Sequence, residues 1–293
     1  MSVDAMARTE QNQRRAVLDA VDRLAPRVVQ SVSDAVKIPS INPKYPGQDY
    51  GKLVGAEGGE VSALMNDLHR EAGASTELVT VEKGRDNACG RITGTGGGRS
   101  LLLNGHVDVV PPNREGLWDH APFSGLITDD AVHGRGGATD NKAGTVAAAY
   151  AAIALATAGI RLQGDLVLQA VVGEEVGDHL SGTTAALQAG YGADAAIVCE
   201  PSNFSDAPPN LVPSTPPGLL WFSLSLVGKA AHSGLRGGLT IHPTLEGEAL
   251  GVNTIDKFWI IYHALRQLED TWARRDRHPP CSSRATSISC PGG

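Results

Sequence analysis

The sequence is poor in aromatic residues, and its few cysteines are widely scattered. Aromatic residues make up 4% of the 293-residue chain, so any core must be built mainly from valine, leucine, isoleucine and alanine. The four cysteines, Cys89, Cys199, Cys281 and Cys290, show no spacing typical of metal ligands. We therefore expect free thiols in a reducing compartment, the cytoplasm.

Signals for membranes, nucleic acids and nucleotides are also missing. The first 15 residues are charged and contain no apolar segment, unlike a signal peptide. The apolar residues 143–160 are mostly alanine with threonine and glycine, which favours a helix buried in a soluble core over a membrane span. A net charge of −7 argues against nucleic acid or an anionic membrane as the main partner. The glycine-rich GTGGGRS lacks the GK[ST] ending of a phosphate-binding loop.

Helix and strand patterns alternate along the first two hundred residues. Pro26 interrupts the first helical pattern and is predicted to start a second helix. The alternation predicts an α/β fold, a three-layer domain with a mixed, mainly parallel sheet. Helices are expected at residues 16–36, 60–72 and 143–160, and strands at 91–92, 100–110, 165–172 and 195–199.

The composition changes after this region. Residues 206–218 include five prolines and predict a linker between domains. The apolar residues 219–228 then predict a strand, and residues 253–272 predict an amphipathic helix. We expect one domain over residues 1–213 and the start of a smaller α+β domain over 214–293. Residues 279–293 fit neither pattern, and two explanations stay open for them: a shift in reading frame or a natural disordered tail.

The apolar strand in LLLNGHVDVVPP ends with His106 and Asp108. Residues two apart on a strand face the same way, so these side chains can touch. A metal-binding histidine usually donates its other ring nitrogen to a carboxylate, and open α/β sheets bind ligands at the carboxyl ends of their strands. A histidine that is simply hydrogen-bonded at a capped strand end is the alternative.

Acidic residues follow the other predicted strands or precede a helix. Glu174 and Glu175 directly follow one strand, and Glu200 follows another. Asp140 lies among small residues in GRGGATDNKAG, where it could instead be a helix N-cap. Carboxylates that converge without basic partners need a cation. A mixture of imidazole and carboxylate ligands suits zinc, cobalt or manganese.

These motifs together resemble a known family. GHVDVVP, GRGGATDNKAG, GEEVG and CEPS, with VKIPSIN near the start and KAAHSG further on, resemble the dinuclear zinc aminoacylases and carboxypeptidases, the M20 peptidases. That family includes acetylornithine deacetylase, succinyl-diaminopimelate desuccinylase, aminoacylase-1 and glutamate carboxypeptidase. The resemblance implies a zinc-peptidase-like catalytic domain interrupted by an α+β lid, which is also the dimerisation domain.

The resemblance also implies a role for each site residue. His106 and Glu200 would bind one zinc ion, Asp140 would bridge two, and Glu175 would bind the second. Asp108 would orient His106, and Glu174 would be the general base. His232, from the lid, would reach across a dimer to the substrate or its oxyanion; without the resemblance it is an ordinary surface histidine.

The implied activity is hydrolysis of the amide bond of an N-acyl amino acid by metal-activated water. A dipeptidase or carboxypeptidase of the same family is one alternative, and an inactive remnant that binds metal weakly is another. The family's second metal takes a further histidine from beyond the lid, and the chain ends inside the expected lid. We therefore expect the second metal to be weakly held, and a homodimer only where the lid is complete.

Overall fold

The computed structural model describes residues 3–55, 58–113, 115–201, 222–232, 234 and 251–275. The chain divides into two units, Met1–Asn210 and Leu211–Gly293, which are described separately. The expected proline-rich linker at 206–218 and the unusual tail at 279–293 lie outside the described residues.

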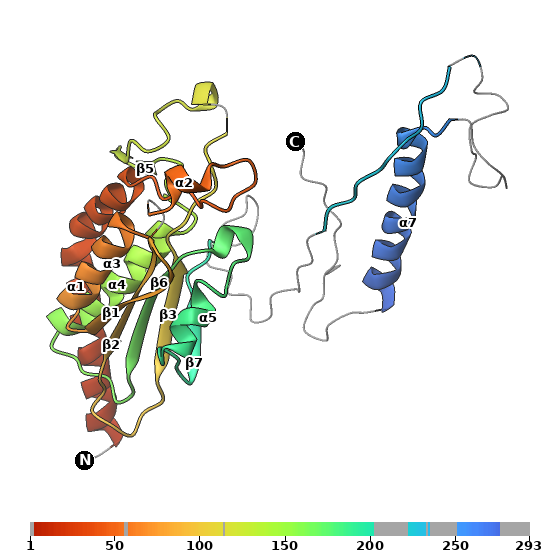
Figure 1. Cartoon of the computed structure of the whole chain (residues 1–293). Helices are drawn as coiled ribbons and strands as arrows, with labels where there is room; N and C mark the ends of the chain where they lie inside the picture. Colours follow the sequence, from red (N-terminus) through yellow and green to blue (C-terminus); the bar gives the residue numbers. More distant parts are fainter. Residues whose placement is uncertain are drawn as a thin grey trace. The chain divides into compact units, whose positions relative to one another are not determined.

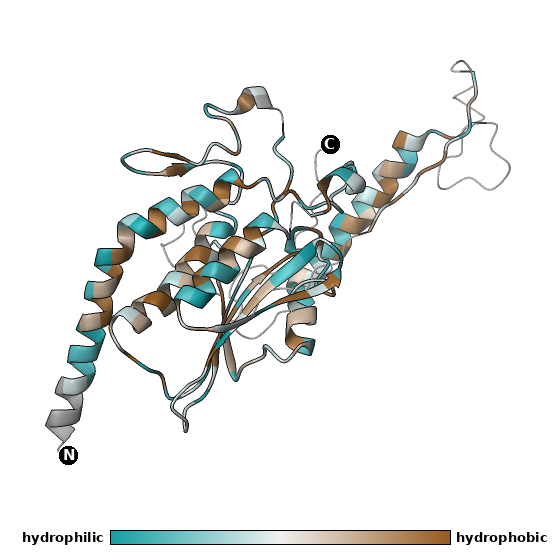
Figure 2. Ribbon diagram, turned by 60° about the vertical axis from the view of Figure 1, so that its left-hand side comes forward, coloured by the Kyte–Doolittle hydropathy of each residue, from teal (hydrophilic) through white to brown (hydrophobic). Residues whose placement is uncertain are grey.

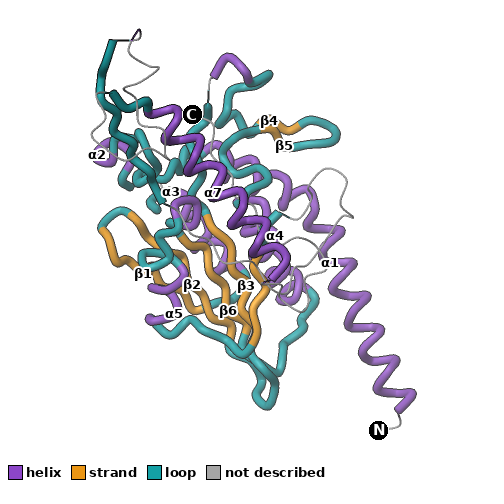
Figure 3. The backbone as a smooth tube through the Cα atoms, turned by 90° about the vertical axis from the view of Figure 1, so that its right-hand side faces the viewer, coloured by secondary structure: helices purple, strands orange, loops and turns teal. Residues whose placement is uncertain are grey.

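A mixed five-stranded sheet forms the centre of the first unit, in the order β1-β2-β6-β3-β7 (Figures 1 and 3). Its β1–β2 and β2–β6 pairs are antiparallel, and its β6–β3 and β3–β7 pairs are parallel. The sheet is mixed as expected, but parallel pairs are half of the total and not the majority. The strands are β1 (Ser75–Glu82), β2 (Arg85–Ile92), β3 (Leu101–His106), β6 (Leu166–Val171) and β7 (Ala195–Val198).

Helices cover both faces of this sheet, as the three-layer prediction requires (Figure 1). Helices α3 (Glu60–Glu71) and α4 (Lys142–Thr157) pack on one face, and α1 (Val3–Lys37) packs against α4. The short helix α5 (Thr183–Gln188) contacts β1 and β6 and carries Ala186 in a small core cluster of its own. The remaining short elements are α2 (Tyr50–Leu53), the 3-10 turns η1 (Glu115–Leu117) and η2 (Glu174–Val176), and the hairpin of β4 (Leu126–Ile127) and β5 (Val132–His133).

Helix α1 corrects one expectation, because it continues through Pro26 without a break. Its apolar residues recur at helical spacing, and its hydropathy alternates along the ribbon (Figure 2). Ala20, Ala35 and Val36 on the inner side are fully buried. Proline removes one backbone hydrogen bond, and packing on both sides of it outweighs that local cost.

Strand β6 lies at the centre of the sheet, which explains why its sequence is apolar except for one residue. Every residue of β6 is buried, since β2 and β3 flank it and helices lie on both faces. Its one polar side chain, Gln169, accepts a hydrogen bond from Asn104 at 2.7 Å and donates one to the Tyr191 carbonyl at 2.8 Å. β3, β6 and β7 run parallel, so their carboxyl ends meet at one edge of the sheet.

The second unit contributes helix α7 (Thr254–Arg275), which Asn253 caps by accepting a hydrogen bond from the Ile255 amide at 2.9 Å. The predicted strand at residues 219–228 is wrong for its described part, because residues 222–228 belong to no strand. An apolar run becomes a strand only beside a partner, and the bridge described in this unit joins Lys229 and Val252. No helix in the described part of the chain is both long and apolar enough to cross a membrane.

Candidate metal centre

The site begins at the end of β3 with a buried imidazole. His106 is the last residue of β3, and its side chain is 1% exposed. Its Nδ1 atom lies 2.9 Å from the backbone carbonyl of Asp108 and 3.4 Å from the Asp108 carboxylate. Both neighbours are acceptors here, so Nδ1 carries the proton and donates it. The other nitrogen, Nε2, is thereby left to face the carboxylates opposite.

Asp108 is fully buried and ties three segments together. Its carboxylate accepts hydrogen bonds from the Asn42 side chain at 2.8 Å and from the amides of Glu174 and Glu175 at 3.3 and 3.1 Å. Burial alone would raise the pKa of this carboxyl, but the bonds and charge of His106 hold it below its ordinary value. Asp108 thus stays ionised while it orients the ring of His106.

Asp140 meets His106 from the segment before α4. Its Oδ1 atom lies 2.9 Å from Nε2 of His106. The alternative role as an N-cap does not apply, because Asn141 occupies the cap position of α4. Glycines make this approach possible: a Cβ on Gly144 would lie 2.3 Å from the carbonyl oxygen of Cys199. The first turn of α4 therefore lies directly against the end of β7.

The strand ends beside β3 bring the remaining acids to the same place. Oε2 of Glu174 and Oε1 of Glu200 lie 3.8 and 3.7 Å from Nε2 of His106. Ligand atoms of His106, Asp140 and Glu175 all lie within 4.8 Å of one another, a spacing at which they could hold one metal ion. The structure thus brings together all six residues that the sequence motifs single out in the first unit.

Burial and neighbouring charges shift the pKa values of the site residues. Burial raises the pKa of Glu175 to about 7, and Asp140, Asp108 and Glu174 add to the rise while His106 opposes it. Burial likewise raises the pKa of Glu200. For His106, burial acts to lower the pKa, yet the surrounding carboxylates raise it to about 11. The carboxylates around His106 thus favour a positive charge on its ring, whereas burial of Glu175 and Glu200 favours their neutral forms.

Two supporting residues were not identified from the sequence. Asn42 lies in the VKIPSIN motif and orients Asp108. Lys142 is fully buried, and burial lowers its pKa to about 7. Its Nζ atom donates to the carbonyls of Ala35 and Ile38 at 2.8 and 2.7 Å. The sequence contains a sign of this role, because Lys142 begins a helix whose following residues are small or apolar. A buried lysine in such a helix needs hydrogen-bond acceptors.

The seventh predicted site residue, His232, belongs to the second unit. It is exposed, and its Nδ1 atom accepts a hydrogen bond from the Gly234 amide at 3.1 Å. This contact within the described part of its loop is consistent with either of the two roles considered for His232. Its part in the site remains a prediction.

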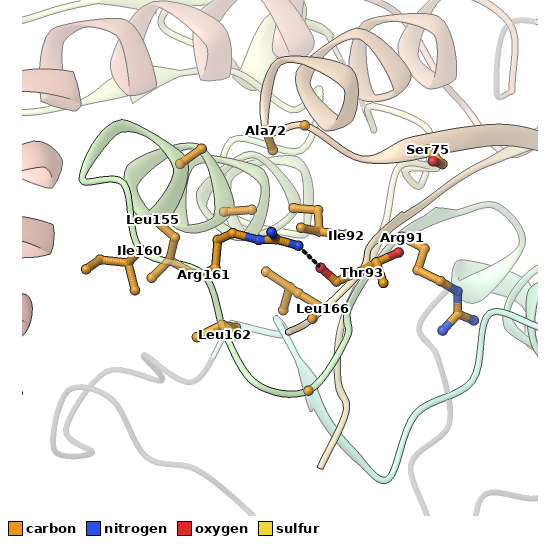
Figure 4. Close-up of a pocket in the computed structure, with 15 residues that line it drawn as sticks. Ala72, Ser75, Arg91, Ile92, Thr93, Leu155, Ile160, Arg161, Leu162 and Leu166 are labelled. Atoms are coloured by element: carbon orange, nitrogen blue, oxygen red, sulfur yellow. Dashed lines mark hydrogen bonds between the residues drawn. The ribbon is translucent and has the colours of Figure 1, made fainter. Parts of the chain in front are cut away.

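A separate cavity of about 390 Å³ lies at the opposite end of the sheet (Figure 4). Ile92 and Leu166, which pair across β2 and β6, line it, whereas His106 pairs with Val171 at the other end of β6. The side chain of Arg161 points to the Thr93 carbonyl, which accepts its hydrogen bond at 3.4 Å. No acidic residue or histidine is among the described residues that line this cavity, so it is not part of the metal centre.

Comparison with known proteins identifies the family. Residues 102–287 match the peptidase family M20/M25/M40. The chain belongs to this family. It is 33% identical over 221 residues to N-formyl-4-amino-5-aminomethyl-2-methylpyrimidine deformylase of Bacillus subtilis, a match that covers 75% of this chain and 48% of the relative. It is 41% identical over 157 residues to succinyl-diaminopimelate desuccinylase of Methylobacterium nodulans, covering 50% of this chain and 38% of the relative.

Solved structures agree on the fold of this M20-family chain. Human carnosine dipeptidase 1 superposes with a TM-score of 0.53 at 20% identity, over 63% of this chain and 40% of that protein. The matched family is metal-dependent, and the described residues include a group that could hold a metal ion. The chain spans less than half the length of the curated relatives it matches.

Proposed function

We propose that this chain is the metal-binding part of a hydrolase that cleaves the amide bond of an N-acyl amino acid or a related N-acyl amine. One observation carries the proposal. Nδ1 of His106 donates to Asp108, so its unprotonated Nε2 would face the Asp140 carboxylate at 2.9 Å with two electron-rich atoms in contact. A shared cation, either a proton or a metal ion, must lie between them.

The donor set supports zinc, with cobalt or manganese as alternatives, because it mixes one imidazole with carboxylates. We propose that His106, Asp140 and Glu200 would hold a first ion, and that Asp140 and Glu175 would contribute to a second. Glu175 lies close enough to His106 and Asp140 to share one ion with them as well. A second ion with only two protein ligands among the described residues would be weakly held.

Different residues of the chain would carry out different parts of the hydrolysis. A bound divalent cation would supply a water acidified enough to attack a carbonyl at neutral pH. Glu174, whose side chain is 44% exposed next to the ligands, would accept the proton of that water and return it to the leaving amine. Asp108 would keep the proton of His106 on Nδ1, so that Nε2 stays available as a ligand.

The substrate class is supported by the curated relatives. Those named above are a deformylase and a desuccinylase, and both names describe removal of an acyl group from nitrogen. This favours a small N-acyl substrate over a dipeptidase or carboxypeptidase, although the fold is shared with a dipeptidase. An inactive remnant that binds metal weakly is the other alternative.

We further propose the domain roles. Residues 1–213 would form the metal-binding domain in the cytoplasm, and residues 214–293 would begin a lid. His232 would donate an N–H to the substrate or its oxyanion, within a homodimer where the lid is complete.

The decisive experiment measures metal content and hydrolysis on the same preparations. The chain is loaded with zinc, cobalt or manganese, its bound metal is counted by mass spectrometry, and it is assayed with formyl, acetyl and succinyl amino acids and with dipeptides. Glu174→Gln should keep the metal and lose activity, by about 100-fold or more for a general base. Metal binding without hydrolysis would support the remnant, and a chain that binds no divalent cation would refute the metal site itself.

A further inference from the structure

The turn that carries Glu174 and Glu175 is short and closed. It leaves β6 at Gly173 and ends at Asp178, whose amide donates to the Gly173 carbonyl at 2.8 Å. Gly173 and Gly177 adopt left-handed conformations, with φ of 86° and 68°. The turn places the carboxylates of Glu174 and Glu175 next to each other. Because two negative charges repel, contacts with other segments are needed to hold the turn in this conformation.

One side of the turn is held by the metal centre. The Asp108 carboxylate accepts hydrogen bonds from the amides of Glu174 and Glu175. These two bonds fix the backbone of the turn relative to His106. They cannot by themselves define where its far end lies, because both come from one carboxylate.

The other side of the turn is held by a buried arginine on β2. The side chain of Arg85 is fully buried, and its Nη1 atom lies 2.5 Å from Oδ2 of Asp178 and 2.9 Å from Oε2 of Glu82. Its guanidinium also lies against the turn backbone, since a Cβ built on Gly173 would be 3.1 Å from Nη2. The planar guanidinium thus places Nη1 against the two carboxylates and Nη2 against the turn backbone, and the single nitrogen of a lysine at this position could not do both.

A third segment connects the two sides. Lys44 lies 2.8 Å from Asp178 and 2.7 Å from Glu82, so it contacts the same two carboxylates as Arg85. Its backbone amide donates to the Asn42 side chain at 2.9 Å, and Asn42 donates to Asp108. Asp108, Asn42, Lys44 and Asp178 thereby form a closed loop of contacts around the turn.

We propose that Arg85 is a positioning residue for the Glu174–Glu175 turn: through Asp178 it fixes the two carboxylates against Asp108. This inference rests on the proposed function, in which Glu174 moves a proton and Glu175 holds a metal ion. Arg85 is fully buried, and in this inference it acts through the turn. Its loss would therefore displace both carboxylates while leaving the rest of the sheet intact.

The test uses hydrogen exchange of the Glu174 and Glu175 amides in the metal-free chain. Arg85→Lys keeps the charge but loses the planar fork, and Asp178→Asn keeps Arg85 but removes its partner carboxylate. In both variants these amides should exchange about tenfold faster or more, the effect of losing one hydrogen bond between charged groups. Cobalt affinity should also fall about tenfold, with a changed absorption spectrum of the bound cobalt.

The chain offers a matched control on the same two strands. Arg91, at the other end of β2, pairs with Asp165 just before β6 at 3.0 Å. Arg91→Lys and Asp165→Asn should leave the turn amides and the cobalt spectrum unchanged. If Arg85→Lys fails to fold, Asp178→Asn is compared with Lys44→Met, which removes the other cation on Asp178. Faster exchange in Asp178→Asn but not in Lys44→Met assigns the effect to Arg85, and equal exchange in the two variants overturns the inference.

The outcomes separate this inference from the proposed function. Unchanged turn amides in both test variants would overturn it, and so would equal acceleration of the β3 amides, which would mark Arg85 as a general stabiliser. A wild-type chain that binds no cation and hydrolyses no substrate would refute the proposed function. The exchange pattern would still decide whether Arg85 holds the turn.

Discussion

Nε2 of His106 lies 2.9 Å from Oδ1 of Asp140, although the two residues are 34 positions apart and come from a strand end and a helix start. Replacing Asp140 with asparagine removes the charge that a shared cation needs. We expect Asp140→Asn to weaken divalent metal binding by about tenfold or more, measured by calorimetric titration with zinc or cobalt. Asp67→Asn, on the exposed side of α3, is the control and should bind like the wild type. Equal affinities for the wild type and Asp140→Asn would contradict the site.

Gly144 should not tolerate even alanine. Alanine favours a helix over glycine by ~1 kcal/mol, so propensity alone predicts a more stable protein. In α4, however, a Cβ at this position would lie 2.3 Å from the Cys199 carbonyl and 2.6 Å from the Asn141 side chain. Overpacking costs ~1–3 kcal/mol, so after the gain in propensity we expect Gly144→Ala to lower the free energy of unfolding by up to ~2 kcal/mol.

Urea denaturation measures this effect, with Gly116→Ala as the control. A Cβ on Gly116 would have no atom within 4 Å, so this substitution should leave stability nearly unchanged. A Gly144→Ala protein more stable than the wild type would mean that α4 can move away from β7.

His69 should make the protein less stable in mild acid. It lies on α3 with 2% exposure, and its Nδ1 atom has no hydrogen-bond partner among the described residues. Burial lowers its pKa from 6.5 to about 4. As pH falls below 6.5 the unfolded chain gains a proton that the folded chain refuses, so stability is lost between about 6.5 and 4 and then levels off. The total loss from this group is about 3 kcal/mol.

The measurement compares wild type and His69→Leu by urea denaturation across this pH range. Other titrating groups are common to both proteins, so the difference isolates His69. The gap in unfolding free energy should widen as pH falls, in favour of the leucine variant. Parallel pH profiles for the two proteins would show that burial does not lower the pKa of His69 in the folded state.

Lys142 should be needed for stability as well as for the shape of the site. Its side chain is fully buried, and its Nζ atom donates hydrogen bonds to two carbonyls at the end of α1. Lys142→Met would leave those acceptors without a donor, which costs ~1–3 kcal/mol. Thermal denaturation measures the loss. Lys52→Met, at an 82% exposed side chain, is the control and should stay within ~0.5 kcal/mol of the wild type.

The sequence was sufficient where periodicity is strong and local. The buried helices α3 and α4 and the apolar strands β3, β6 and β7 were all predicted from hydrophobic pattern. Strand β1 and the first part of β2 were not, because β1 is mostly exposed and its charged residues hide the pattern. Pro26 predicts a break in the sequence because local helix propensity does not include the packing of α1 on α4.

The residue types of the site were determined by the sequence alone. A histidine and acids placed directly after apolar strands predict a cation site, because parallel strands deliver their ends to one edge. Only the tertiary structure decided which atoms meet: that Nδ1 of His106 is occupied by Asp108, that Asp140 is not the helix cap, and that Arg85 lies beneath the acidic turn. Hydrogen bonds form over about 3 Å and depend on direction. The order of residues in the sequence gives neither the distance nor the direction between side chains that come from distant segments.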